Sequence, residues 1–390
     1  MKHWRKAVRS TANSGNGRRL SSMAGSLKRV PFPADHGAHD DREWLTVKFL
    51  HRGSYCADRD SAWTRQFPKR EPTWGACRFT FDPEERMYDW LVVYHDLPRP
   101  GGNTPGPTME KLACSRNNTM HVTYEPSSIT TYGHAYLRQY GHVLTSQEPS
   151  CIRHPGMIHS QPGFPWFYGK STGGGKHLDF DELAAMTAPE KTKLLSTVCS
   201  TKRQKHTAHG LRYGFTQRLK KTLPEMEVFG LGVRPIEDKA EALDCYKYHL
   251  AIENHRAPHH WTEKLADPFL GFSLPFYAGC HNASDYFPAE SFVPIDPRDF
   301  EGSLATIRSV IENDEYEKRL PAILEARRMV LEEYNLFAVL SREIERLHQT
   351  GETKPGEILC RKAFWRKHPL ARLHCVAEKT LRMAKGYLRR

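Results

Sequence analysis

The residues best placed for chemistry lie in segment 248–279, which reads YHLAIENHRAPHHWTEKLADPFLGFSLPFYAG. It begins as an apolar strand pattern that ends in a Glu-Asn pair, and a loop rich in histidine and proline follows. Thr262 is then positioned to cap a helix whose first turn contains Glu263 and Lys264. The first amide groups of a helix have no partner within it, and the helix dipole adds positive potential, so a helix start of this kind attracts anions.

Lys264 allows two interpretations. A lysine in the first turn lies at the positive end of the dipole and is unfavourable there, a cost that is offset if an anion such as a diphosphate binds beside it. In the other interpretation the side chain simply extends into solvent, which is the commoner outcome for a single lysine. The spacing alone leaves both open.

A second candidate is the carboxylate of Glu125. The strand pattern MHVTY at 120–124 runs directly into Glu125-Pro126-Ser127-Ser128. A carboxylate just past a strand lies at the edge where open α/β sheets present ligand-facing groups. Glu125 could therefore act as a general base whose pKa is raised by partial burial. The alternative is an ordinary carboxylate in a turn.

Two motifs resemble known sites but do not fit them. The GKS at 169–171 would need glycine at position 164 to complete a phosphate-binding loop, and Phe164 stands there. Asp179 and Asp181 have the spacing of a metal-binding DxD motif, but they open a helical pattern, where acids are favoured anyway. We therefore expect neither a phosphate-binding loop nor a metal.

Histidines also cluster near the predicted helix start, at His255, His259 and His260. No HExxH motif or Cys/His spacing accompanies them, so zinc is not indicated. We expect these side chains to shape a pocket.

Two sets of strands and helices would position these residues. The first set contains apolar runs of strand type at 44–50, 90–95, 120–125 and 142–146. The second contains strands at 193–200, 226–230, 248–254 and 272–279, alternating with helices near 207–223, near 239–246 and from 263. Such alternation predicts parallel sheets with right-handed crossovers.

Two further helical patterns complete this reading. Leu211, Phe215, Leu219 and Leu223 recur every four residues and predict one apolar stripe against the second sheet. A long helix is expected over 315–348, with its end packed onto the first lobe.

Composition and charge limit the class of protein. The chain has 390 residues, enough for two domains, and its nine scattered cysteines fit reduced thiols. It contains no apolar run of about 18 residues and no signal-peptide core, so we expect a cytoplasmic protein.

The net charge of +12 lies at the ends of the chain: residues 1–30 carry +8 and residues 361–390 carry +9, which leaves −5 for the body. This distribution does not suit a nucleic-acid groove. The basic residues of 361–390 alternate with apolar ones, which fits either an anionic membrane surface or a solvated tail.

Several motifs in the order found here resemble the alpha-1,3-fucosyltransferase family (glycosyltransferase family 10), in its bacterial cytoplasmic form. They are LLSTVCSTKRQKHTAHGLRYGFTQRL at 194–219, the segment 248–279, and NASDYFPAESFVPIDPRDF at 282–300. The similarity covers about residues 85–345. It implies an α/β GT-B fold, in which two Rossmann-like lobes face each other across a cleft.

The resemblance also implies roles for individual residues. Arg212 and Lys264 match the cations that hold the diphosphate of GDP-fucose, Glu263 the acid that contacts the donor ribose, and Asn254 the amide of the Glu-Asn pair. His260 stands where the family usually has an aromatic hydroxyl; it could still donate to phosphate, with an affinity that would depend on pH.

Glu125 matches the family's general base. The implied reaction is an inverting transfer of L-fucose from GDP-fucose to a glycan hydroxyl, with an alpha-1,3 linkage in surface polysaccharide or glycoconjugate synthesis, and with neither cofactor nor metal. The alternatives are another GDP-deoxysugar as donor, or an adaptor that binds membrane or nucleic acid through its basic tails.

The expected organisation has five parts. These are a disordered basic leader (1–44), an acceptor-side α/β lobe (45–170), a linker (171–190), a GDP-sugar-binding lobe with a closing helix (191–350), and a basic amphipathic tail (351–390). The expected partners are a GDP-sugar, a glycan acceptor and, through residues 361–390, the inner face of an anionic membrane.

Overall fold

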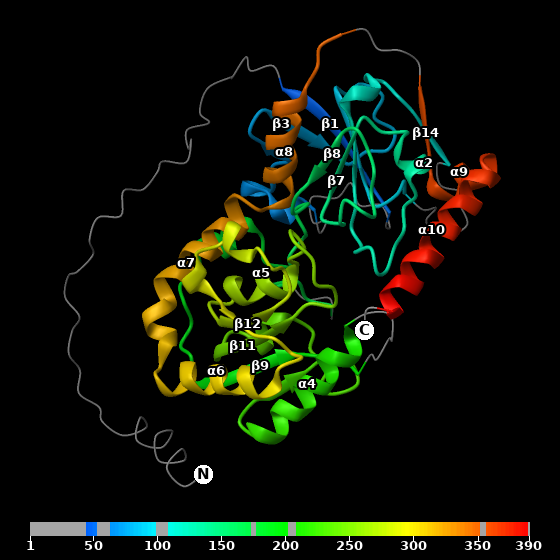
Figure 1. The fold of residues 1–390 in the computed structure, drawn as a ribbon. Coiled ribbons are helices and arrows are strands. Elements are labelled where there is room, and N and C mark those ends of the chain that lie inside the picture. The colour runs from blue at the N-terminus through cyan, green and yellow to red at the C-terminus, as the bar shows by residue number, and fades with distance from the viewer. Residues whose placement is uncertain are drawn as a thin grey trace. The chain divides into compact units, whose positions relative to one another are not determined.

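A computed structural model describes residues 44–52, 63–98, 108–172, 177–201, 208–351 and 356–388. The predicted leader, apart from its last residue, lies outside the described residues, as does part of the glycine-rich passage of the predicted linker. The described chain contains two large, separate sheets, each with its own helices (Figure 1).

The first sheet has seven strands in the order β2-β3-β1-β4-β6-β7-β8, and every neighbouring pair is parallel except β2 with β3. The strands are β1 Leu45–His51, β2 Thr73–Trp74, β3 Cys77–Thr80, β4 Trp90–Tyr94, β6 Thr119–Val122, β7 His142–Thr145 and β8 Met157–His159. The four predicted strands are confirmed to within one to three residues at their ends. Their unbroken apolar runs are explained by burial on both faces, as in β4, where every residue is buried.

The second sheet has five parallel strands in the order β10-β9-β11-β12-β13. They are β9 Lys193–Val198, β10 Glu227–Phe229, β11 Tyr246–Ile252, β12 Leu274–Ala278 and β13 Val293–Pro294. The longer helices of this lobe are α4 His209–Thr222, α5 Glu263–Leu270, α6 Phe300–Glu312 and α7 Glu315–Glu332. The helix expected near 239–246 is a short 3-10 turn, η4 Lys239–Ala242.

Short elements complete the two lobes. They are β5 Met109–Lys111, the helices α2 His134–Leu137 and α3 Phe180–Ala185, and the 3-10 turns η1 Thr64–Gln66, η2 Pro68–Arg70, η3 Arg116–Asn118, η5 Ala283–Asp285 and η6 Ala289–Ser291.

The long helix expected over 315–348 is two helices. It breaks after α7, and Asn335 caps the next helix, α8 Leu336–Leu347, by accepting a hydrogen bond of 2.9 Å from the amide of Phe337. α8 packs in the core of the first lobe, where the Phe337 ring stacks on Phe67 with 4.1 Å between centroids. The expectation that the end of this helical region packs onto the first lobe is thus confirmed.

Part of the segment predicted as a basic tail is built into the first lobe. Strand β14 Glu357–Leu359 pairs antiparallel with β5, and helix α9 Arg361–Lys367 follows it. Ile358 and Phe364 are buried in the first lobe's core. The folded chain therefore continues past residue 350, because these apolar side chains find a place in that core, and it ends in helix α10 Pro369–Leu388.

The predicted apolar stripe of α4 is wrong at one position. Phe215, Leu219 and Leu223 are buried, but Leu211 is 38% exposed and its neighbour Arg212 is only 7% exposed. Steps of four residues advance about 40° around a helix. The stripe has therefore turned away from the sheet by Leu211, and the arginine faces inward instead.

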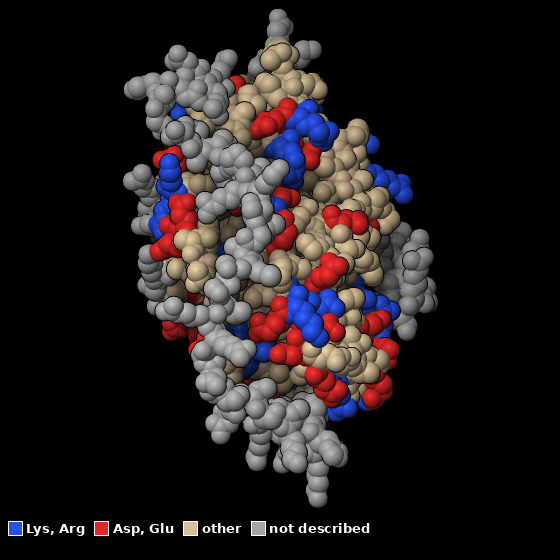
Figure 2. All heavy atoms as spheres, turned by 90° about the vertical axis from the view of Figure 1, so that its left-hand side faces the viewer, with Lys and Arg blue, Asp and Glu red and all other residues tan. Residues whose placement is uncertain are grey.

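One face of the described chain mixes both charges. On the face shown in Figure 2, Lys and Arg side chains lie beside Asp and Glu side chains, without a broad basic patch among the described residues. Among the described residues, no helix combines the length and the apolar character that a membrane span requires.

Candidate functional site

A cavity of about 230 Å³ lies at the carboxyl ends of the second sheet's strands. Its wall includes residues that directly follow β9, β10 and β11, together with the first turns of α4 and α5. Four of the residues predicted to bind a donor line it: Arg212, Asn254, Glu263 and Lys264. The structure therefore brings together side chains that lie 52 positions apart in the sequence.

Glycine is required where β10 meets this cavity. Gly230 has φ +126°, and a Cβ there would lie 3.0 Å from the carbonyl carbon and oxygen of Cys199. Glycine alone adopts this conformation without strain. It lets the ends of β9 and β10 approach closely enough to form one side of the cavity.

The start of α5 is fixed by a capping residue and a buried acid. Thr262 accepts from the amide of Lys264 at 3.3 Å, as the sequence predicted. Glu253 in turn accepts from both the amide and the hydroxyl of Thr262, each at 2.9 Å. Burial raises the pKa of Glu253 above its usual range. The helix start is therefore held to the end of β11 by a carboxylate that is itself poorly solvated.

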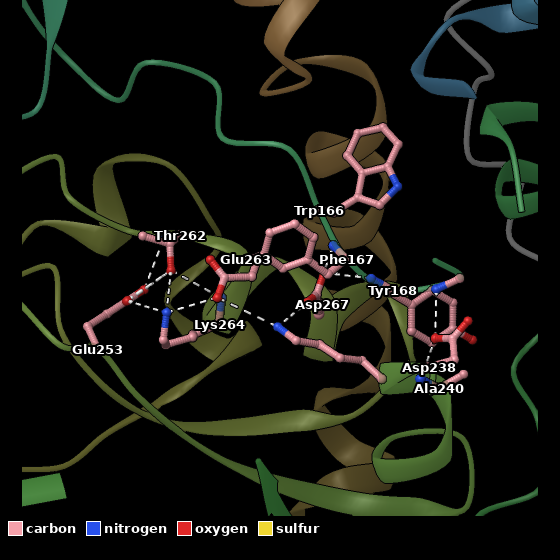
Figure 3. Close-up of polar contacts among 12 residues, drawn as sticks. Trp166, Phe167, Tyr168, Asp238, Ala240, Glu253, Thr262, Glu263, Lys264 and Asp267 are labelled. Carbon is pink, nitrogen blue, oxygen red and sulfur yellow. Dashed lines mark hydrogen bonds and ion pairs between the residues drawn. The ribbon is translucent and has the colours of Figure 1, made fainter. Parts of the chain in front are cut away.

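The side chain of Lys264 does not extend freely into solvent. Its ammonium lies 2.8 Å from Glu263 Oε1 and 3.7 Å from Glu253 Oε2, and its side chain is 22% exposed (Figure 3). Burial alone would lower the pKa of Lys264, but the two carboxylates outweigh it and raise that pKa. They also offset the unfavourable helix dipole, so the lysine is held charged at the cavity wall.

Arg212 contributes a cation of a different kind. Its side chain is 7% exposed and lines the cavity, and its Nε has no hydrogen-bond partner among the described residues. Within the same part of the chain, no carboxylate forms an ion pair with it. A buried guanidinium without an anion is costly, which is typical of a group that awaits an anionic ligand. Its charge also acts on Lys264, so the two cations share one site.

The sequence reading missed two residues of this site, Lys239 and Asp267. Lys239 Nζ lies 2.6 Å from Asp267 Oδ2 and 3.7 Å from Glu263 Oε1. Asp238, just before it, caps the η4 turn, which is a signal for a turn but none for a lysine that points into a site. Lys239 is found only once the fold places η4 beside α5.

Glu125 lies just past β6, as predicted, and within electrostatic reach of the start of α5. Burial raises the pKa of Glu125; the charge of Lys264 lowers it and that of Glu263 raises it further. Its backbone is fixed because Gln147 Nε2 donates to the Glu125 carbonyl at 2.7 Å. Glu125 of the first lobe and Lys264 of the second thus act on one another.

His260 is placed differently from the expectation. It is not among the residues that line the cavity; it is 3% exposed, and its Nδ1 lies 2.9 Å from the hydroxyl of Ser146 in the first lobe. Burial, with a smaller contribution from the charge of His255, lowers the pKa of His260 to about 3. It is therefore neutral near physiological pH, and the expected pH dependence of donor affinity through this histidine does not follow.

The other predicted histidines form contacts between the lobes. His255 Nε2 lies 3.1 Å from Glu148 Oε1, and the His259 ring lies 4.7 Å from that of His159. No cluster of three or more His, Cys, Asp or Glu side chains suited to a metal was found among the described residues.

The acids of the DxD motif serve the structure. Asp179 caps α3 and forms a capping box with Glu182, as the sequence indicated, while Asp181 accepts from the amide of Lys69.

Comparison with known proteins identifies the lobe that carries the cavity. Residues 188–318 match the family described as glycosyltransferase family 10 (fucosyltransferase), C-terminal part. The chain therefore carries a segment of the family 10 glycosyltransferase type, at residues 188–318. Every residue of the cavity wall lies within the matched segment. The two α/β lobes, each built on a sheet of mostly parallel strands, make the GT-B fold.

Among solved structures, this chain is similar to proteins described as alpha1,3-fucosyltransferase. One has a TM-score of 0.45 and 15% identity, covering 82% of this chain and 94% of that chain. A complex with GDP-fucose has the same score and coverage at 14% identity. A complex with GDP has a TM-score of 0.41 and 18% identity, covering 77% and 94%. No curated protein gives a sequence match.

Proposed function

We propose that this glycosyltransferase transfers L-fucose from GDP-fucose to a hydroxyl of a glycan, with inversion and in an alpha-1,3 linkage, in surface polysaccharide or glycoconjugate synthesis. The observation that carries the proposal is the buried guanidinium of Arg212, which faces the cavity beside Lys264 without a carboxylate partner among the described residues. A diphosphate is the ligand that this pair of cations fits best.

The two cations suit different parts of that task. A guanidinium can bind two phosphate oxygens at once, and an ammonium adds a compact charge. The first turns of α4 and α5 both line the cavity, and helix starts favour anions. Together these groups would neutralise the diphosphate as it leaves, so the proposed reaction needs no metal.

The cavity volume matches part of a nucleotide sugar. Its roughly 230 Å³ is below the about 300–1,000 Å³ of whole ligand sites, so the wall described here accounts for the diphosphate and ribose. Glu263 and Asn254 would contact the ribose side, and the Asn254 Oδ1 atom is buried without a hydrogen-bond partner in the described chain. Leu231, 69% exposed at the wall, offers an apolar surface to the base.

Glu125 is the proposed general base. It would take the proton of the acceptor hydroxyl as that oxygen attacks the anomeric carbon of the donor. The bond from that carbon to the phosphate oxygen breaks in the same step, and the electron pair leaves with GDP, held by Arg212 and Lys264. Attack from the face opposite the leaving group inverts the anomeric centre. The raised pKa of Glu125 makes its carboxylate a stronger base than a solvated one.

A donor screen tests this function. Nucleotide sugars that differ in base and sugar are incubated with the protein, free sugar is quantified, and the donors that react are then given a panel of glycan acceptors. We expect GDP-fucose to be consumed, and proton NMR of the product to show an inverted anomeric configuration. Consumption of a different GDP-deoxysugar would favour the closest alternative, and consumption of none would contradict the proposal.

The alternative of another class is an adaptor that acts through its basic ends. Lys264→Ala should abolish GDP binding in calorimetry, while removal of residues 369–390, which keeps the buried Phe364, should leave GDP binding intact. The reverse pattern would support the adaptor.

Helix α10 supports one further partner, an anionic membrane surface. Leu370, Leu373 and Val376 are 80%, 66% and 55% exposed, and basic residues flank them in sequence. Replacing the three with serine should weaken sedimentation with phosphatidylglycerol vesicles. Unchanged sedimentation would contradict this contact.

A further inference from the structure

We propose that Lys239 is a positioning residue that couples diphosphate binding at Lys264 to the chain segment 166–169. The proposal deepens the proposed function and rests on it, because it concerns what happens at the α5 start when a nucleotide diphosphate binds. It arises from one continuous series of charged contacts, most of which Figure 3 shows.

Lys239 is shared between two carboxylates. Its ammonium lies 2.6 Å from Asp267 Oδ2 and 3.7 Å from Glu263 Oε1. The same Oε1 atom of Glu263 lies 2.8 Å from the ammonium of Lys264. Glu263 therefore has one near cation, which faces the proposed diphosphate, and one more distant cation behind it.

The other carboxylate holds the backbone of segment 166–169. Asp267 Oδ1 accepts from the amides of Phe167 at 2.9 Å and Tyr168 at 3.1 Å. Asp267 is buried, with 1% of its side chain exposed. Lys239 is thus bonded to the group that fixes two consecutive amides of this segment.

Segment 166–169 is also held from the first lobe. The buried Arg65 donates to the carbonyls of Gly169, Trp166 and Tyr168 at 3.1, 3.2 and 3.3 Å. Amides of this segment thus donate to Asp267 of the second lobe, whereas its carbonyls accept from Arg65 of the first lobe. If the hydrogen bonds to those amides weaken, segment 166–169 connects the two lobes less firmly.

A diphosphate would redistribute these contacts. Phosphate oxygens draw the Lys264 ammonium away from Glu263, which leaves Lys239 as the nearest cation to Glu263 within the described chain. Lys239 then moves toward Glu263, from which it lies 3.7 Å, and its 2.6 Å contact with Asp267 lengthens. Glu263 then stays in place for the ribose, while Asp267 holds the amides of Phe167 and Tyr168 less firmly.

Two measurements test the proposal. Hydrogen exchange on the wild-type chain should show faster exchange of the Phe167 and Tyr168 amides when GDP is added. Lys239→Met should abolish this response and raise the Kd for GDP about tenfold, because Lys264, the cation that the diphosphate needs, is then the one cation near Glu263 in the described chain.

Lys247→Met is a matched control. Lys247 lies 3.0 Å from Asp314 and 3.7 Å from Glu317, with 25% of its side chain exposed against 20% for Lys239. It is not among the residues that line the cavity. This variant should keep both the GDP Kd and the exchange response of the wild type.

A double-mutant cycle separates indirect action from direct contact with phosphate. If Lys239 acts through Glu263, Lys239→Met should change the GDP Kd less than about twofold in a Glu263→Gln background. Additive effects would overturn the proposal, as would an unchanged exchange rate of the two amides in the wild-type chain. That second result needs no variant and so does not depend on the folding of Lys239→Met.

If the wild-type chain does not bind GDP, the proposed function fails and this inference fails with it. GDP binding together with an additive cycle refutes only the role of Lys239.

Discussion

Replacing Arg212 with methionine should make the protein more stable and nearly unable to bind GDP. Arg212 is 7% exposed, and its Nε has no hydrogen-bond partner in the described part of the chain. It also repels Lys264, whose pKa its charge lowers. Methionine keeps much of the side-chain length and removes both costs.

The magnitudes follow from the cost of a buried unpaired group. Leaving such a group without a partner costs about 1–3 kcal/mol, so Arg212→Met should gain on the order of 1 kcal/mol after the imperfect fit of methionine is subtracted. A gain of that size raises the unfolding midpoint by roughly 2–4 °C. When GDP is bound, Arg212 would form a buried charge pair with the diphosphate. Removing one member of such a pair costs about 3 kcal/mol of binding free energy, or roughly 100-fold in Kd.

Differential scanning fluorimetry and calorimetric titration with GDP measure the two effects on the same samples. Arg218→Met on the same helix is the control, because Arg218 is 56% exposed and pairs with Glu301; it should change neither quantity much. A variant at Arg212 that is less stable than wild type and binds GDP normally would refute the reasoning.

Three other expectations concern the first lobe. Glu125→Gln should reduce the rate of transfer at least 100-fold while the GDP Kd stays within about threefold; a matching loss of GDP binding would place Glu125 in the donor site instead. Because burial raises the pKa of Glu125 and a base must be ionised, kcat/KM for the acceptor should fall as pH decreases, with a midpoint above 4.5, and a flat profile down to pH 4 would contradict this role. Phe364→Ala should cost about 3–5 kcal/mol in urea denaturation because the ring is buried in the first core, whereas a loss under 1 kcal/mol would show that α9 is not part of that core.

The sequence predicted well the features that depend on local pattern. The buried runs of β4, β11 and β12 were recognised because strands covered on both faces read as continuous apolar segments. Thr262 was recognised as a cap from its place before Glu263 and Lys264, and the structure confirms the cap. Asp179 was likewise recognised as the start of a helix.

Features that depend on distant partners were not predictable. β14 is three residues long and pairs with β5 almost 250 positions earlier, so neither strand shows a period that could be detected. The break between α7 and α8 was also missed, because the apolar pattern continues on both sides of Asn335.

The candidate site divides in the same way. The resemblance to family 10 placed Arg212 at the cavity, whereas the apolar spacing of α4 pointed to Leu211, which is exposed. Lys239 has no motif of its own, and its role depends on the folded distance to Glu263 and Asp267. His260 was assigned by position alone, and its contact with Ser146 became visible only when the first lobe was in place.

The most direct test of the account is the position of the phosphates in a crystal structure of the protein with GDP. We expect phosphate oxygens within hydrogen-bond distance, about 2.7–3.2 Å, of both the Arg212 guanidinium and the Lys264 ammonium. GDP bound with its phosphates against other side chains, while Arg212 and Lys264 contact no phosphate oxygen, would contradict the central claim.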